Sequence, residues 1–264
     1  MRKLAVCIGI NDYPGADSDL AGCVNDAGDW AAALDRRGFE VEKLLDARAK
    51  KKAMCAAVAR VLRTAQAGDS VIITYSGHGS FIPDPDGDEP DGTDEILCPW
   101  DIDKGNVLSD DELDALFARH AQDVKVVMIA DSCHSGTVSR LASPPSQGVR
   151  APRVRFLPPS AFMHTDAVAS LPPCKARRAL PPRGNGALLL AGCQDTEYSY
   201  DAWFGDRANG AFTYTALKTL AALKPEATYL DWYKAIRAQL PSKDYAQTPN
   251  LYGTAAQKRW RVLE

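Results

Sequence analysis

The sequence predicts an α/β fold, in which helices cover a largely parallel β-sheet. Short runs of apolar and β-branched residues alternate along the chain with longer stretches that have helical spacing, and this alternation is typical of parallel sheets. Two of the apolar runs pass directly into short polar turns that end in glycine. The 264 residues can bury a full core, and 45% apolar and 25% charged residues are ordinary for a globular protein.

The first half of the chain alternates strands with helices. Strands are expected at residues 4–10, 39–45, 71–75 and 124–130. Helices are expected at residues 19–37, 50–67 and 109–120. Ser109 and Glu112 have the spacing of a capping box, which predicts where the third helix begins. A long acidic loop is expected between residue 79 and that helix.

The second half begins with a change of composition. Residues 140–185 hold nine prolines and eight basic residues against a single acid, Asp166, which predicts a long linker loop. Order is expected to resume with a buried strand at 187–193, followed by helices at 210–223 and 229–240. A last short strand is expected within 248–263, near the edge of the sheet.

Composition and charge narrow the class of protein. A net charge of −3 does not favour nucleic acid or an anionic membrane as the main partner, and no apolar run approaches the roughly 18 residues of a membrane span. We expect a cytoplasmic monomer that binds neither nucleic acid nor membrane. Seven widely spaced cysteines without a CxxC pair argue against a disulfide framework and a zinc site.

Two strand ends carry the candidate chemistry. Cys133 follows the strand expected at 124–130, and His78 lies between two glycines after the strand at 71–75. Open α/β sheets place their chemistry at this carboxyl edge. A thiol needs a base at neutral pH, so the sequence predicts Cys133 as nucleophile and His78 as its base. The N–H groups of Gly79 and Cys133 are the candidate oxyanion donors. A histidine satisfied within a turn is the plainer interpretation of His78 taken alone.

Three motifs resemble those of metacaspases, the caspase-like peptidases of plants, fungi, protists and bacteria. The motifs are Tyr75–Gly79 (YSGHG), Asp131–Gly136 (DSCHSG) and Gly22–Asp26 (GCVND). Ala191–Asp195 and Asn209–Phe212 resemble the small-subunit region of that family. The histidine precedes the cysteine by 55 residues, close to the caspase spacing. The resemblance covers most of the chain, and the first two motifs together are highly specific.

The resemblance implies a caspase-like three-layer sandwich with a mostly parallel sheet of about six strands. It implies one caspase-like domain over residues 1–264, divided into a large part (1–139), the linker (140–185) and a small part (186–264). The implied activity is that of a cysteine endopeptidase that cleaves protein or peptide substrates after arginine or lysine. No cofactor is required for this chemistry.

The family's pocket for the basic side chain corresponds here to Asp26 and Asp131, with Cys23 and Ser76 lining it. Two carboxylates can bind a cationic side chain through charge-assisted hydrogen bonds, and they would repel an acidic one. Without the resemblance, a solvated acid on a helix and a capping group would be the plainer interpretations of the two aspartates.

The stretch Asp84–Glu95 is strongly acidic, since seven of its twelve residues are Asp or Glu. Oxygen ligands suit Ca²⁺, although the stretch lacks the glycine that an EF-hand requires. The resemblance implies an activating calcium site at Asp94, Asp110 and Asp111. Arg140 stands where the family often has a further acid, which argues against calcium dependence. A solvated acidic loop is the alternative.

The basic linker, which we expect to be exposed, is also a natural substrate for a peptidase that cuts after arginine or lysine. We therefore expect self-cleavage within 140–185. The candidate sites are Arg150, Arg153, Arg155, Lys175, Arg177, Arg178 and Arg183.

Three other functions remain open at this level. The first is a cysteine peptidase of the same fold with another specificity, and the second is a non-catalytic caspase-like signalling module. The third is a metal-binding protein built on the acidic stretch.

Overall fold

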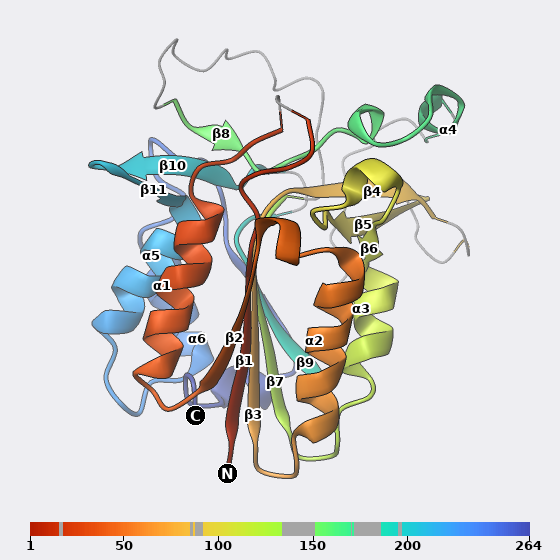
Figure 1. The fold of residues 1–264 in the computed structure, drawn as a ribbon. Coiled ribbons are helices and arrows are strands. Elements are labelled where there is room, and N and C mark those ends of the chain that lie inside the picture. The colour runs from red at the N-terminus through yellow and green to blue at the C-terminus, as the bar shows by residue number, and fades with distance from the viewer. Residues whose placement is uncertain are drawn as a thin grey trace.

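A six-stranded sheet forms the centre of the protein in the computed structural model (Figure 1). The structure describes residues 1–15, 18–84, 87, 92–133, 151–169, 171, 186–194 and 197–264. In spatial order the strands are β12 (Asn250–Tyr252), β9 (Ala187–Ala191), β7 (Lys125–Asp131), β3 (Ser70–Ser76), β1 (Lys3–Gly9) and β2 (Glu40–Leu45). All neighbours pair in parallel except β12, which is antiparallel to β9 at the edge.

Helices cover both faces of this sheet (Figure 1). One layer consists of α1 (Cys23–Asp35), α5 (Ala211–Ala221) and α6 (Tyr229–Arg237). The other consists of α2 (Lys51–Thr64) and α3 (Asp110–Phe117). Short 3-10 helices lie at Asp46–Arg48, Ile102–Lys104, Pro159–Ala161 and Gln257–Arg259. The predicted three-layer α/β sandwich with a mostly parallel sheet is confirmed, including the short strand at its edge.

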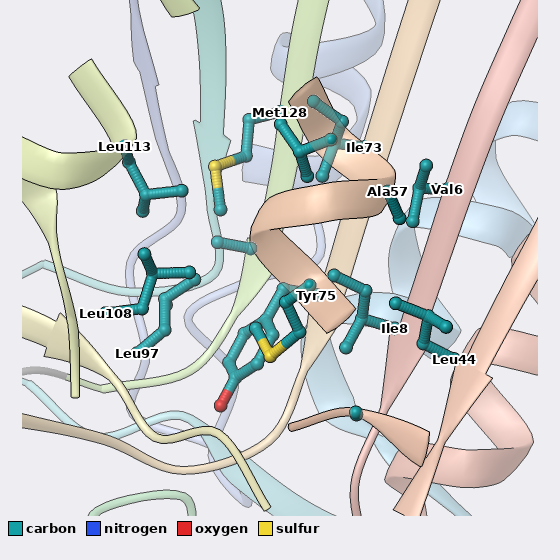
Figure 2. Packing of buried hydrophobic residues seen from close by; sticks show 14 of the residues in the cluster. Val6, Ile8, Leu44, Ala57, Ile73, Tyr75, Leu97, Leu108, Leu113 and Met128 are labelled. Carbon is teal, nitrogen blue, oxygen red and sulfur yellow. The ribbon is translucent and has the colours of Figure 1, made fainter. Parts of the chain in front are cut away.

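Alternate side chains of the central strands pack into two separate cores. Leu4, Val6 and Ile8 of β1 belong to the cluster beneath α2 and α3, called the main core below, which Figure 2 shows. Ala5 and Cys7 point the other way, into the cluster beneath α1, α5 and α6. Successive strand residues face opposite sides of a sheet, so strands buried on both faces are continuously apolar. This is why the strands could be recognised in the sequence.

Helix α1 begins later than its apolar spacing predicted, at Cys23 instead of residue 19. The side-chain oxygen of Asn11, just after β1, accepts the N–H groups of Cys23 and Val24 at 2.7 and 3.2 Å. A cap supplied from outside the helix fixes its first turn, and helical periodicity cannot reveal such a cap. The capping box of Ser109 and Glu112 at α3 is confirmed.

A second, three-stranded antiparallel sheet stands where the sequence predicted one long acidic loop. Its strands are β4 (Gly79–Pro83), β5 (Thr93–Leu97) and β6 (Leu108–Ser109). The prediction was wrong because the acidic residues of β5 interrupt the apolar pattern that marks a strand. Its Ile96 and Leu97 are nevertheless buried in the main core. This sheet lies beside the carboxyl end of the large sheet (Figure 1).

A third small sheet lies at the same end of the molecule (Figure 1). It is formed by β8 (Arg153–Val154), β10 (Tyr200–Phe204) and β11 (Arg207–Gly210). Strand β8 and helix α4 (Thr165–Ala169) come from the region predicted to be an exposed linker. That prediction is wrong for Arg155 and Leu157, whose side chains are 0% and 4% exposed.

Within the described residues, no helix is both long and apolar enough to cross a membrane.

Candidate active site

The two predicted catalytic residues follow adjacent parallel strands. Ser76 of β3 pairs with Asp131 of β7, and His78 and Cys133 each lie two residues further on. Both are buried, at 4% and 0% exposure. The paired strand ends therefore bring to one edge of the sheet two side chains that lie 55 residues apart in the sequence.

The imidazole of His78 is held by the backbone carbonyl of Ser18, which lies 2.7 Å from Nε2. With Nε2 as the donor, Nδ1 keeps a free lone pair, and it has no hydrogen-bond partner among the described residues. No hydrogen bond joins this imidazole to the Cys133 thiol in the described part of the chain. Burial lowers the pKa of His78 to about 4, and the positive charge of Arg155 acts in the same direction.

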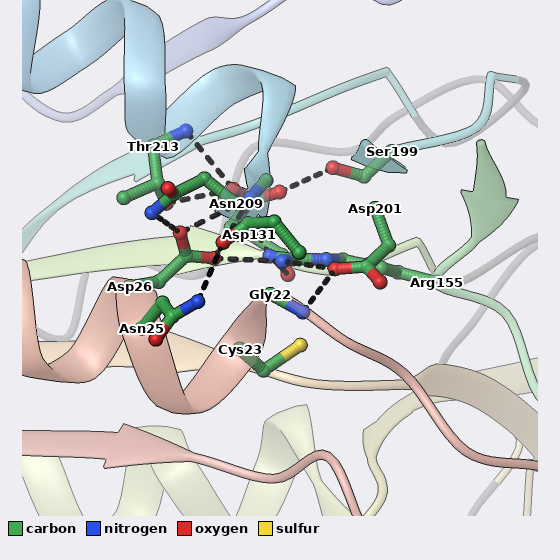
Figure 3. Close-up of polar contacts among 12 residues, drawn as sticks. Gly22, Cys23, Asn25, Asp26, Asp131, Arg155, Ser199, Asp201, Asn209 and Thr213 are labelled. Atoms are coloured by element: carbon green, nitrogen blue, oxygen red, sulfur yellow. Dashed lines mark hydrogen bonds and ion pairs between the residues drawn. The ribbon is translucent and has the colours of Figure 1, made fainter. Parts of the chain in front are cut away.

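A pocket of three carboxylates lies beside these residues, and Arg155 fills it (Figure 3). Its Nη2 lies 2.7 Å from Asp26 Oδ2 and 2.9 Å from Asp201 Oδ1. Its Nη1 lies 3.1 Å from Asp131 Oδ2. All four side chains are at most 3% exposed. The two aspartates predicted to bind a basic side chain thus meet one, and it belongs to the same chain.

The amino end of α5 holds two of these carboxylates in place. Asp131 Oδ2 accepts the backbone N–H of Thr213 at 3.0 Å and its hydroxyl at 2.7 Å. Asp26 Oδ1 accepts the N–H of Gly210 at 3.0 Å and the amide of Asn209 at 2.8 Å. A helix amino terminus offers unpaired N–H groups and favours negative charge. Gly210 is required here because a Cβ atom would collide with the Asp131 carboxylate.

Asp201 is a pocket residue that the sequence reasoning did not identify. It lies on β10, and its carboxylate accepts the N–H groups of Ala21 and Gly22 at 2.7 and 2.9 Å. Gly22 makes this approach possible, because a Cβ there would lie only 2.6 Å from Asp201 Oδ1. The only sequence signal was the acidic and aromatic stretch around it, which predicted no particular partner.

The pocket charges depend on one another. Burial raises the pKa of Asp26 to about 6, while the positive charge of Arg155 opposes this shift. Burial alone would lower the pKa of Arg155, but the surrounding negative groups, led by Asp131, hold it well above its ordinary value. The arginine therefore remains charged and offsets carboxylates that are otherwise costly to bury.

The backbone of Arg155 is bound as completely as its side chain. Its carbonyl oxygen accepts the N–H groups of Gly79 at 3.0 Å and Cys133 at 3.2 Å, the two predicted oxyanion donors. Its own N–H donates to the carbonyl of Ser199 at 2.9 Å. The N–H of Ser199 in turn donates to Cys133 Sγ at 2.8 Å. The carbonyl oxygen of Arg155 thus lies between the two predicted oxyanion donors, and Ser199 connects the N–H of Arg155 with the Cys133 thiol.

The chain before Arg155 adds to this arrangement as a strand. Strand β8 pairs antiparallel with β10, so that Val154 lies opposite Tyr200 and Arg153 opposite Asp201. Antiparallel addition to a sheet is a common way to bind an extended peptide. Ser199, which the sequence reasoning also missed, links this strand to the thiol.

The two residues predicted to line the pocket have a smaller part in it. Cys23 is fully buried near Arg155 at the start of α1 (Figure 3), and burial raises the pKa of its thiol well above the ordinary value. Ser76 is 1% exposed at the end of β3. Neither side chain hydrogen-bonds Arg155 within the described residues.

The predicted calcium ligands lie on two neighbouring elements, a strand and a helix. Asp94 lies in β5, while Asp110 and Asp111 begin α3. In the part of the chain that the structure describes, no three acidic, histidine or cysteine side chains gather as a metal site would require. Residues 85–86 and 88–91 of the acidic stretch and Arg140 lie outside the described residues. Calcium activation stays a prediction.

The predicted self-cleavage sites divide into two groups. Arg153 is exposed at the surface, whereas Arg155 is buried in the pocket, which corrects its expected exposure. The others lie outside the described residues: Arg150, Lys175, Arg177, Arg178 and Arg183.

Comparisons with known proteins identify sequences similar to this chain. A family model described as the caspase domain matches residues 2–260. The chain is similar to Metacaspase-1B of Aspergillus oryzae, with 30% identity over 95% of this chain and 67% of the relative. It is also similar to Metacaspase-1 of Cryptococcus neoformans var. neoformans, with 30% identity over 95% of this chain and 62% of the relative. The chain thus spans about two thirds of the length of these fungal relatives.

Two solved structures resemble the fold. Protein GSU0716 from Geobacter sulfurreducens is 31% identical, with a TM-score of 0.76 over 100% of this chain and 98% of that one. Caspase-1 from Spodoptera frugiperda is 11% identical, with a TM-score of 0.60 over 96% of this chain and 86% of that one. The second likeness concerns the fold alone.

Proposed function

This chain belongs to the caspase-domain family of cysteine peptidases, and we propose that it is an endopeptidase that cuts proteins after arginine. The observation that carries the proposal is the position of Arg155. Its guanidinium lies among three carboxylates, and its carbonyl oxygen accepts two backbone N–H groups beside the Cys133 thiol. A substrate arginine bound in the same way would present its carbonyl carbon to the nucleophile.

The proposed chemistry follows from these contacts. The thiolate of Cys133 attacks the carbonyl carbon, and the electron pair of the C=O bond moves to oxygen, where the N–H groups of Gly79 and Cys133 hold it. His78 gives the thiol proton to the nitrogen of the next residue, the C–N bond breaks, and an acyl-enzyme thioester remains. Water then gives a proton to His78 and attacks the thioester, the C–S bond breaks, and His78 returns the proton to the sulfur of Cys133. The product leaves as the arginine acid, which ionises in water.

The pocket supports arginine over lysine. Two nitrogens of one planar guanidinium reach three carboxylates that stand on α1, β7 and β10. A lysine ammonium is a single point charge and cannot span such a set. We therefore narrow the expected preference for arginine or lysine to arginine first, with lysine as the weaker substrate and acidic residues excluded.

The same contacts support self-cleavage between Arg155 and Phe156. Until that bond is cut and the new end leaves, the segment occupies the pocket that a substrate arginine needs. The intact chain is therefore expected to be inhibited by its own segment. Self-processing would relieve the inhibition.

The test uses the full chain and matched peptides. Peptides that differ only in arginine, lysine or aspartate before the cut should be cleaved in that order, with aspartate not cleaved. Mass spectrometry of the chain should find fragments 1–155 and 156–264. Cys133→Ala should stay intact and cleave nothing. Parallel assays with Ca²⁺ and with a chelator test the implied activation by calcium.

Three outcomes would contradict the proposal. Cleavage of Cys133→Ala as fast as the parent chain would show that Cys133 is not the nucleophile. Faster cleavage after aspartate or an apolar residue would favour a peptidase of other specificity. A chain that cleaves no peptide and whose Cys133 resists a covalent thiol probe, even after Arg155→Ala opens the pocket, would favour the non-catalytic module.

A further inference from the structure

We propose that the substrate-binding site continues past the cut as two apolar subsites built on β4, which select an aromatic residue and then an aliphatic residue after the arginine. The inference rests on the proposed function, because it treats Arg155–Phe156 as the substrate bond. The ligand class is a peptide of the form arginine–aromatic–aliphatic. The chain's own Phe156 and Leu157 occupy the two subsites.

The backbone of the segment adds to the open side of β4. The N–H of Gly79 donates to the Arg155 carbonyl, and the Gly79 carbonyl accepts the N–H of Leu157, both at 3.0 Å. Gly79 and Phe156 form a parallel bridge. In the described sheet, β4 pairs with β5 on its other side. Strand addition of this kind holds any sequence through its main chain, so selectivity must come from the side chains.

The first subsite is aromatic. The ring of Phe156 stacks on Phe81 of β4, with centroids 6.1 Å apart and an interplanar angle of 20°. Phe156 also packs against the cluster formed by Cys133, Cys193 and Tyr198. An aromatic ring is favoured here because offset stacking adds to the burial of apolar area.

The second subsite opens into the main core. Leu157 is 4% exposed and belongs to the cluster that lies beneath α2 and α3. Successive side chains of an extended segment point to opposite sides, which is why Phe156 and Leu157 enter different clusters. An acidic side chain in the place of Leu157 would be buried without a partner, and this is costly. The second subsite should therefore exclude acids.

The test measures kcat/KM of the self-processed full chain on peptides that copy residues 151–159. Relative to the reference peptide, alanine for the phenylalanine should reduce kcat/KM about 3- to 10-fold, the value of an aromatic pair. Aspartate for the leucine should reduce it about 10- to 100-fold, the value of a buried leucine. All peptides keep the same residues up to the arginine, so the acidic pocket contributes equally.

A variant links the preference to β4. Phe81→Ala should bring the ratio of the phenylalanine peptide to the alanine peptide close to one. Phe204→Ala, which removes a ring of β10 that stacks on Tyr214 of α5, should leave the ratio unchanged. If Phe81→Ala does not fold, the peptide series on the unaltered chain still decides the matter.

The outcomes separate the two proposals. Equal cleavage of all peptides after arginine would overturn the apolar subsites and leave the proposed function intact. An unchanged ratio in a folded Phe81→Ala would overturn the role of β4. No cleavage of the reference peptide by the processed chain would overturn the proposed function, and the subsites with it.

Discussion

The two sides of the Arg155–Phe156 bond are held by different forces. Before the bond, a buried arginine meets three carboxylates. After the bond, Phe156 and Leu157 are held by ring stacking and by burial in the main core. Buried ion pairs are selective but contribute little net stability, because desolvation offsets their attraction. Apolar burial is less selective and contributes more. The comparison suggests that the charged contacts select the residue before the proposed cut. Apolar packing holds the segment in place.

Removal of the charge should have the largest effect. With Cys133→Ala as the background, so that the bond stays intact, Arg155→Ala should lower the free energy of unfolding by about 3–5 kcal/mol, because three buried carboxylates lose their partner. Urea denaturation measures the change. Arg153→Ala, two residues away and exposed, is the matched control and should stay within about 0.5 kcal/mol. An equal loss of unfolding free energy in both variants would refute the claim that charge holds the residue before the bond.

Truncation on the apolar side comes next. In the same background, Leu157→Ala should lower the free energy of unfolding by about 2–5 kcal/mol, because it leaves a cavity in the main core. Val154→Ala, a half-buried residue on the other side of the bond, should cost less. Limited proteolysis should also cut the segment sooner in Leu157→Ala. If Leu157→Ala unfolds no more readily than Val154→Ala, apolar packing does not hold the segment.

Asp201→Asn tests one of the three charged contacts by itself. It removes one ionic contact to the guanidinium while an oxygen remains to accept N–H groups, so kcat/KM on arginine peptides should fall about 10- to 100-fold, the value of about 1.5–3 kcal/mol for a charged hydrogen bond. The loss on lysine peptides should be smaller. Asp35→Asn, an exposed aspartate at the end of α1, is the control. An unchanged arginine-to-lysine ratio would show that Asp201 does not contribute to selectivity.

Measured over a single pH unit, acidification should give the smallest effect. The folded chain keeps His78 neutral, with a pKa of about 4 instead of 6.5, so the unfolded chain binds the extra proton between these values. Stability should therefore fall as pH is lowered from about 6.5 to 4, by at most about 1.4 kcal/mol per pH unit. The measurement compares Cys133→Ala with and without His78→Gln, since the opposite contribution of Asp26 cancels in that difference. A pH-independent difference would contradict the burial of His78 beneath the segment.

Much of the fold could be predicted because a strand that is buried on both faces is apolar along its whole length, and this pattern is visible in the local sequence. The strands β1, β3 and β7 are continuous apolar runs, and helices such as α5 and α6 show in their spacing. The strands β4 to β6 were missed because their residues are mixed in character and lie in or beside the acidic stretch. Helix α1 was placed too early because its cap comes from Asn11.

The same contrast applies to the candidate site. Cys133, His78, Asp26 and Asp131 lie in contiguous motifs, so the sequence by itself proposed them. Asp201 and Ser199 carry no motif, and only the antiparallel pairing of β8 with β10 brings them to the thiol and the arginine. Composition suggested that Arg155 lay in an exposed linker. The tertiary structure decided otherwise, because three carboxylates from separate elements form a pocket that only a buried cation can fill.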